Sequence, residues 1–122
     1  MSLPSVTILI ANYNDENYID RCIESAVNQD FPGPLTLCIV DDGSEDGSWD
    51  IITSYLKNPK EDKIEEGIVL TSKNIGRFGR TNIIAIKSKN GGPSSARNVG
   101  INYTLEDTDI YAILDSDDEM YE

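Results

Sequence analysis

Three carboxylates stand close together near the end of the sequence, at Asp115, Asp117 and Asp118. They follow the apolar run from Ile110 to Leu114, which predicts a short buried strand that delivers the acids where it leaves the core. Like charges this close are tolerated when they stay solvated or share a hard divalent cation, which prefers oxygen ligands and commonly also holds substrate phosphates. The acidic segment 115–118 therefore predicts either a solvated loop or a site for a metal ion and phosphates.

Two earlier apolar runs also end in polar clusters. The run over residues 6–11 ends in Asn12-Tyr13-Asn14, and the run over residues 35–40 ends in Asp41-Asp42-Gly43-Ser44. Both runs are rich in β-branched residues and predict strands. Because ligands of open α/β sheets bind beyond the carboxyl ends of the strands, we expect the three clusters to meet at one edge of a sheet.

The side chains in these clusters have a structural and a functional interpretation. The segment Asp41-Asp42-Gly43-Ser44 is typical of a turn, but a carboxylate at a strand end also accepts a hydrogen bond from the N–H of a uracil-like ring. Asp42 or Asp41 is therefore a candidate for reading a base. Tyr13 is a candidate for stacking on that base, and it fits simple packing equally well.

A fourth feature is the segment from Ser94 to Arg97, which predicts the start of a helix. Free amides, the positive end of the helix dipole and a guanidinium group together suit an anion. Arg97 is also consistent with a helix-surface residue that pairs with an acid. The segment predicts an anion site only if it lies near the other three clusters.

Strands and helices alternate along the chain. Helical spacing of apolar residues predicts a helix from residue 19 to about 29, with Asn14 or Asp15 as its cap, and a second helix over residues 48–57. Two strand-helix units in succession imply parallel pairing with right-handed crossovers. We therefore predict one α/β domain over residues 1–122, with a mostly parallel sheet flanked by helices in a Rossmann-like arrangement.

Residues 60–90 are the least regular part of the sequence. The runs 68–70 and 83–86 predict strands. Between them lies the polar, glycine-containing segment 73–80, which predicts either a hairpin arm or a mobile loop.

Charge and composition limit the function. Twenty-two acids against ten bases give a net charge of -12, which argues against a nucleic-acid partner. The same charge would repel a nucleotide diphosphate unless a divalent metal neutralised part of the field. Histidine is absent, so any proton transfer falls to carboxylates or another group.

Cysteine and hydrophobicity bear on the compartment. Cys22 and Cys38 read as small buried hydrophobes in a reducing environment. No apolar run approaches the roughly 20 residues of a membrane helix, and no secretory signal pattern is present. We expect a cytoplasmic location.

The four motifs together resemble those of family 2 glycosyltransferases, which have the GT-A fold. Residues 6–14, 38–46, 90–100 and 114–118 carry the resemblance, with the sequences VTILIANYN, CIVDDGSED, NGGPSSARNVG and LDSDD. Their order and spacing match across nearly the whole chain. Two departures are Ala11, where proline or threonine is more usual, and the segment 73–80, which is longer than expected.

The resemblance implies roles for individual residues. Ala11 and Tyr13 match positions that contact the nucleoside, Asp42 matches the position that recognises the base, and Arg97 matches one that meets the nucleotide side of the donor.

Asp115 and Asp117 match the D-x-D pair of the family. By resemblance this pair holds the ribose and, through Asp117, a Mn²⁺ or Mg²⁺ ion on the diphosphate. Asp118 is adjacent and is expected to assist with the metal.

The implied activity is that of an inverting, hexosyltransferase-like enzyme. It would transfer a sugar from a nucleotide-diphospho-sugar, with a UDP-sugar favoured, to a hydroxyl of a saccharide or lipid-linked acceptor in cell-surface polysaccharide biosynthesis. The acidic general base is expected beyond Glu122. We therefore expect this chain to be the donor-binding part, truncated after the D-x-D motif and inactive alone.

Two alternatives stay open. One is a non-catalytic module that binds a nucleotide-sugar. The other is a phosphoacceptor signalling domain. Against it, Asp41 and Asp42 follow the second strand, whereas such domains place their acid pair after the first strand. A truncated sheet that ends near residues 110–114 is also expected to expose apolar surface and to self-associate.

Overall fold

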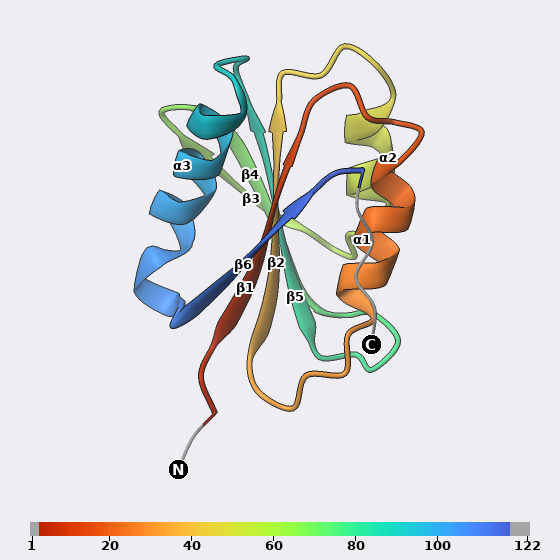
Figure 1. Ribbon diagram of the computed structural model, residues 1–122, viewed down its shortest axis with the longest axis vertical. Coiled ribbons are helices and arrows are strands. Elements are labelled where there is room, and N and C mark those ends of the chain that lie inside the picture. Colours follow the sequence, from red (N-terminus) through yellow and green to blue (C-terminus); the bar gives the residue numbers. More distant parts are fainter. Residues whose placement is uncertain (1–2, 118–122) are drawn as a thin grey trace.

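The computed structural model describes residues 3–117 and contains one six-stranded sheet with helices on both faces (Figure 1). The elements in chain order are β1 (Val6–Asn12), α1 (Ile19–Val27), β2 (Leu35–Asp42), α2 (Ser48–Ser54), β3 (Lys60–Ile64), β4 (Gly67–Ile75), β5 (Thr81–Ser88), α3 (Pro93–Thr104), the 3-10 turn η1 (Leu105–Asp107) and β6 (Ile110–Asp115). Within the described part of the chain, no helix is both long and apolar enough to cross a bilayer.

The strand order across the sheet is β3-β4-β5-β2-β1-β6. Strands β5, β2, β1 and β6 run parallel, whereas β3 and β4 are antiparallel to their neighbours. The predicted α/β fold with a mostly parallel central sheet is therefore confirmed. Because these four parallel strands share one direction, their carboxyl ends all lie at the upper end of the sheet in Figure 1.

Two layers of core cover the two faces of the sheet. Helices α1 and α2 lie on one side and α3 on the other (Figure 1). Successive residues of a strand point to opposite faces, so Ile8 and Ile10 pack under α1 while Leu9 lies in the cluster under α3. This explains why the central strands are almost continuously apolar instead of alternating.

Helix α3 packs closely on the sheet because of one glycine. A Cβ atom at Gly100 would lie 2.4 Å from Leu9 Cδ1 and 3.0 Å from Val40 Cγ2. Arg97 precedes Gly100 by one helical turn and therefore shares its face of the helix. The close approach places the guanidinium above the carboxyl ends of the strands.

Residues 73–80, for which the sequence predicts either a hairpin arm or a mobile loop, belong to a hairpin. Strands β4 and β5 pair antiparallel, and residues 76–80 connect them. This connection is fastened to the segment just after α1, because Arg77 N–H donates to Asn28 Oδ1 at 2.8 Å and Arg80 forms an ion pair with Asp30 at 2.8 Å. Strand β3 was not predicted, because its residues Lys60–Ile64 are mostly charged and exposed.

The prediction that residues 110–114 form a buried strand is wrong in one respect. They do form a strand, β6, but it lies at the outer edge of the sheet and pairs only with β1 among the described strands. Ile110 and Ile113 are 51% and 52% exposed. An apolar run is compatible with a central or an edge strand, so the sequence could not distinguish them.

Candidate functional site

A cavity of about 450 Å³ opens at the carboxyl ends of the strands. It is formed by the ends of β1, β2 and β6, by the turn before α3 and by the first turns of α3. Its lining includes every site residue predicted from the sequence that the structure describes, namely Ala11, Tyr13, Asp42, Arg97, Asp115 and Asp117. Asp118, the second predicted metal ligand, lies outside the described residues. The four motifs of the sequence thus meet at one edge, as parallel pairing requires.

The structure separates the two neighbouring acids at the end of β2. Asp42 lines the cavity, and its two carboxylate oxygens accept hydrogen bonds from the N–H groups of Gly91 and Gly92, each at 2.9 Å. Each oxygen retains a further lone pair that can accept from a ligand. Asp42 therefore fixes the turn before α3 and is also available to a base.

Asp41 points to the opposite face of the sheet, toward α1 and α2. It is fully buried, and its Oδ1 accepts from Asn12 Nδ2 at 2.9 Å and from Ser44 Oγ at 2.5 Å. Asp41 is not part of the cavity lining. Of the two acids left open by the sequence, Asp42 is the one that faces the cavity and Asp41 is a structural residue.

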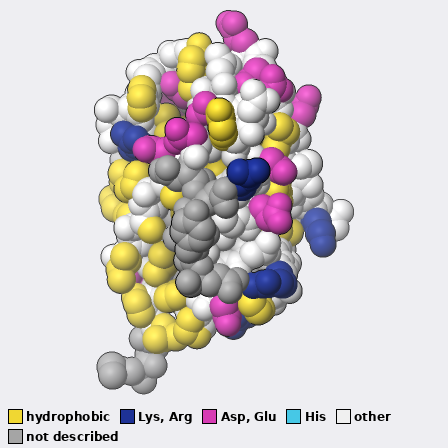
Figure 2. Space-filling model, turned by 45° about the vertical axis from the view of Figure 1, so that its right-hand side comes forward, with side chains coloured by type: hydrophobic (Ala, Val, Ile, Leu, Met, Phe, Trp, Pro, Cys, Tyr) yellow, Lys and Arg dark blue, Asp and Glu magenta, His cyan; other side chains and the backbone are white. Residues whose placement is uncertain are grey.

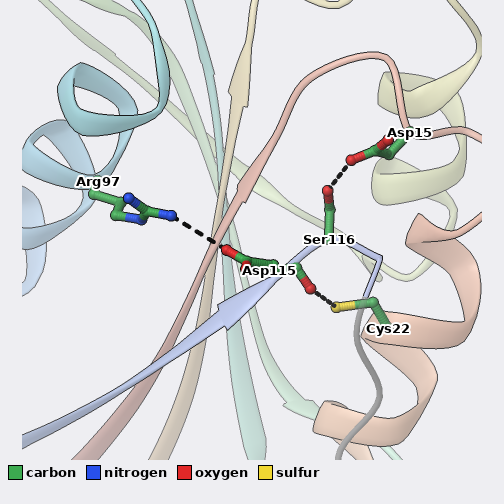
Figure 3. A network of polar contacts seen from close by, with 5 residues as sticks. All are labelled: Asp15, Cys22, Arg97, Asp115 and Ser116. Atoms are coloured by element: carbon green, nitrogen blue, oxygen red, sulfur yellow. Dashed lines mark hydrogen bonds and ion pairs between the residues drawn. The ribbon is translucent and has the colours of Figure 1, made fainter.

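Arg97 and Asp115 form an ion pair across the mouth of the cavity (Figure 3), with Nη2 and Oδ1 3.2 Å apart. Their side chains are 37% and 63% exposed. Ion pairs this exposed contribute at most about 1 kcal/mol. The guanidinium can therefore leave Asp115 for a phosphate at little cost.

The loops after β1 and β2 are locked together beside the cavity. Asn14 N–H donates to Ser44 Oγ at 2.9 Å, and Glu45 N–H donates to Asn14 Oδ1 at 2.8 Å. Asn14 adopts a positive φ of 52°, a conformation that asparagine tolerates better than most residues. A short polar residue is needed here because it must both turn the chain and bridge the two loops.

The D-x-D turn is attached to the first loop and to α1. Ser116 Oγ–H donates to Asp15 Oδ2, and Cys22 S–H donates to the carbonyl of Asp115 at 3.4 Å (Figure 3). Asp15 also lines the cavity. We expected Asn14 or Asp15 to cap α1 with its side chain, but no side-chain cap is present; the carbonyl of Asp15 accepts from Tyr18 and Ile19 N–H instead.

Helix α3 begins at Pro93, before Ser94 and Ser95, the two residues that the sequence predicts as its cap. Its N-cap is Gly92, with a φ of 94°, and no side chain caps it. A β-carbon-bearing residue is disfavoured at such a φ, and proline suits the first helical position because its missing N–H has no helical partner. The following amides of Ser94 and Ser95 lie at the helix start beside the cavity, where an anion is favoured.

Acidic side chains gather on the upper half of the face shown in Figure 2, over the carboxyl ends of the strands. The site residues include Asp115 and Asp117, both exposed. Among residues 3–117, no group of three or more acidic, cysteine or histidine side chains is close enough together to bind a metal ion by itself. One or two carboxylates are nevertheless what Mg²⁺ requires when substrate phosphates and water supply its other ligands. The exposed carboxylate of Asp117 fits that arrangement.

Both cysteines are buried, as predicted, and neither forms a disulfide. Burial raises the pKa of the Cys38 thiol from 9.0 to about 12. The thiol therefore stays protonated and unreactive in the folded protein.

Comparison with known families identifies the chain. The profile of "Glycosyl transferase family 2" matches residues 7–122, which is nearly the whole sequence. The chain belongs to this family.

Several bacterial relatives show how much of a longer protein this chain resembles. It is 36% identical over 114 residues to the minor teichoic acid biosynthesis protein GgaA of Bacillus subtilis, covering 92% of this chain and 21% of GgaA. It is 35% identical over 122 residues to chondroitin synthase of Pasteurella multocida, covering 97% of this chain and 10% of the synthase. The chain thus spans about a fifth or less of these two relatives.

Solved structures agree on the fold. Staphylococcus aureus TarS, residues 1–349, superposes with a TM-score of 0.63 and 25% identity over 94% of this chain and 28% of that one. The same protein in complex with UDP superposes with a TM-score of 0.66 at 22% identity, covering 93% of this chain and 27% of that one. The GT-A architecture expected from the sequence is therefore confirmed.

Proposed function

We propose that this chain binds the donor of an inverting glycosyltransferase, a nucleotide-diphospho-sugar and specifically a UDP-sugar. The observation that carries the proposal is the convergence of Asp42, Arg97, Asp115 and Asp117 on one cavity. TarS, a structural neighbour, has been solved with UDP and with UDP-GlcNAc, which supports a uridine nucleotide.

The cavity divides into a nucleoside end and a phosphate end. Ala11, Tyr13 and Asp42 supply a small side chain, an exposed aromatic ring and a carboxylate, which together suit a ribonucleoside whose base donates an N–H. Arg97 and the start of α3 supply positive charge for a diphosphate. Asp115, the last residue of β6, is the proposed contact to the ribose.

Asp117, with the adjacent Asp118, is the proposed holder of Mn²⁺ or Mg²⁺. Such an ion, when bound, stabilises the charge that develops on the leaving nucleoside diphosphate. Arg97 stabilises the same charge directly, because it exchanges the carboxylate of Asp115 for a phosphate oxygen. Ser94 and Ser95 offer backbone amides to the same group.

A further step concerns the acceptor. Its hydroxyl, on a saccharide or a lipid-linked saccharide, must lose its proton to a positioned base. Family membership and the relatives named for teichoic acid and chondroitin synthesis support a hexosyltransferase of cell-surface polysaccharide biosynthesis. Two buried cysteines that form no disulfide fit a reducing, cytoplasmic compartment.

The exposed edge strand supports a further part of the proposal, self-association of the chain. Within residues 3–117, β6 pairs with β1 along one side and with no strand along the other, and Ile110 and Ile113 are half exposed. Such an edge is a template for pairing with another strand.

Titration of the chain with UDP, GDP and CDP, each with and without Mn²⁺, tests the proposed donor site. Nucleotide at ~100 times its dissociation constant should raise the unfolding free energy by about 2.7 kcal/mol, which a thermal-shift assay detects. We expect UDP with Mn²⁺ to bind most tightly in calorimetry. Equal affinity for all three nucleotides would contradict the uridine assignment, and affinity without metal would contradict the metal site.

A further inference from the structure

Ser116, the middle residue of the D-x-D motif, behaves differently from its two neighbours. It is only 4% exposed, whereas Asp115 and Asp117 are exposed. Figure 3 shows its side chain directed toward Asp15, while that of Asp115 is directed toward Arg97. The turn after β6 therefore presents two acids to the cavity and anchors itself through the residue between them.

The anchor is needed because the sheet stops holding the chain at this point. The ladder between β1 and β6 ends with the pair Ala11 and Asp115. Ser116 and Asp117 follow that last pair, so ladder hydrogen bonds to β1 do not restrain them. The hydrogen bond that Ser116 Oγ–H donates to the carboxylate of Asp15 supplies a restraint instead. A hydrogen bond to an ionised acceptor is roughly twice as strong as one between neutral groups.

Asp15 is itself held independently of Ser116. Its carbonyl accepts from the N–H groups of Tyr18 and Ile19, each at 2.9 Å, in the turn that begins α1. Its neighbour Asn14 is bonded to the loop after β2 through both its backbone and its side chain. The loop that carries Asp15 is thus the fixed partner, and the turn that carries Ser116 is the one that is positioned.

We propose that Asp15 is a positioning residue of the donor site, acting through Ser116. By holding Ser116 it fixes the directions in which Asp115 and Asp117 point, and so the place where they meet the ribose and the metal-bound diphosphate. The proposal rests on the donor-binding function above. Catalytic groups must be placed within about 0.5 Å of the productive geometry, so one lost anchor is enough to weaken the site.

A double-mutant cycle on Asp15→Ala and Ser116→Ala tests this coupling. Each single substitution should weaken Mn²⁺-dependent UDP binding about tenfold, because each removes the same charge-assisted hydrogen bond. The double variant should show the same tenfold loss, since the second substitution has nothing left to break. Asp15→Asn should restore nearly normal affinity, because its amide oxygen can still accept from the serine.

Matched controls separate positioning from stability. Ser72 is also a serine of 4% exposure with hydrogen bonds to Lys57, but it lies far from the donor cavity on β4. Asp20 on α1 accepts from the hydroxyl of Tyr55 and does not line the cavity. Ser72→Ala and Asp20→Ala should lower the melting temperature without changing the affinity for UDP. Losses in the double variant that multiply, or equal losses in the controls, would overturn the proposal.

Amide hydrogen exchange provides a readout that needs no ligand. In Asp15→Ala, the amides of residues 115–117 should exchange at least about tenfold faster, while those of β1 and β2 stay protected. Unchanged exchange at these amides would refute the anchoring role whatever the binding data show. If the unsubstituted chain fails to bind UDP with Mn²⁺, the donor-site function is wrong, and exchange alone then decides whether Asp15 holds the turn.

Discussion

Two cavities of similar size lie at opposite ends of the sheet, and they differ in chemistry. The carboxyl-end cavity, of about 450 Å³, is lined by aspartates, an arginine and asparagines. The amino-end cavity has a volume of about 390 Å³, and half of its lining residues are serine or threonine, with Lys73 and Asp107 as its charged residues. The hydroxyl groups of Thr7 and Thr108 are hydrogen-bonded to each other at 2.7 Å, and those of Ser72 and Thr104 donate to backbone carbonyls. Volume alone would not distinguish the two cavities.

The difference follows from the direction of the strands. At their carboxyl ends, parallel strands pass into loops that are free to carry acids and glycines, and α3 begins there with unpaired amides. At the amino ends the chain returns from helices, and η1 and the start of β6 close the edge with local hydrogen bonds. Five charged side chains therefore line the carboxyl-end cavity, whereas two line the amino-end cavity.

Removing an acid from each end gives the largest expected contrast. Asp117→Asn should lower Mn²⁺-dependent UDP affinity by at least about 100-fold, because a neutral amide binds a divalent cation poorly. Asp107→Asn, the same substitution in the amino-end cavity, should leave the affinity unchanged. Calorimetry on both variants measures this contrast. A comparable loss in Asp107→Asn would show that the two ends are not functionally distinct.

The two acids at the end of β2 sharpen the comparison within the carboxyl end. Asp41→Ala should lower the free energy of unfolding by about 2–3 kcal/mol, because it leaves Asn12 and Ser44 without their buried acceptor. Asp42→Ala should cost only about 1 kcal/mol, since Gly91 and Gly92 can turn to water. Urea unfolding measures both values.

Binding should show the reverse order. Asp42→Ala should weaken UDP binding about tenfold through the loss of its ligand contact and of the fixed turn, whereas Asp41→Ala should retain affinity in the folded fraction. If Asp41→Ala abolished binding while Asp42→Ala did not, the assignment of the two acids would be reversed.

Periodicity and turn chemistry were sufficient to predict the central fold. The runs 6–11 and 35–40 carry enough β-branched and apolar residues to predict strands, and the apolar stripe of α1 predicts its helix to within two residues. Strand β3 could not be predicted, because an edge hairpin made of charged residues has no hydrophobic pattern. The edge position of β6 could not be predicted either, since it depends on which strands pair.

The site shows a similar limit. Each strand end could be assigned from the sequence, and parallel pairing brings them together. Because neighbouring residues of a strand face opposite sides of the sheet, the sequence predicts that Asp41 and Asp42 point to different faces. It does not predict which of the two faces carries the cavity. The link between Asp15 and Ser116 spans 101 positions. No local pattern signals a contact of that length.

Cys38 lies near the centre of the sheet, midway between the two ends, and its thiol should make the free energy of unfolding depend on pH. The Cys38 thiol has a pKa of about 12 when folded against 9.0 ordinarily, so the folded state holds this proton more tightly. Its contribution to stability is complete below pH 9 and is lost as the pH rises through 12. By about pH 10.5 the loss should be about 2 kcal/mol.

Cys38→Ala isolates this effect, because other titrating groups are common to both proteins. Between about pH 8 and pH 10.5, the free energy of unfolding of the variant should fall less than that of the unsubstituted chain, by about 2 kcal/mol. Parallel stability curves would mean that the thiol titrates in the folded state near its ordinary pKa.

The two lateral edges of the sheet differ in their expected tendency to self-associate, and this difference is the smallest of the predicted effects. At one edge, β3 carries mostly charged, exposed residues, which discourages pairing with another sheet. At the other, β6 exposes Ile110 and Ile113. We expect weak self-association through β6, which Ile113→Lys should reduce by roughly 1 kcal/mol, given that the side chain is already half buried.

Sedimentation velocity over a wide range of concentrations measures this association. Ile68→Lys is the matched control, because Ile68 is 37% exposed on β4, the strand beside the charged edge. It should leave the sedimentation profile unchanged. A clean monomer at high concentration would show that an apolar strand edge is insufficient for pairing here. Equal effects of the two substitutions would attribute the association to general hydrophobicity and not to the β6 edge.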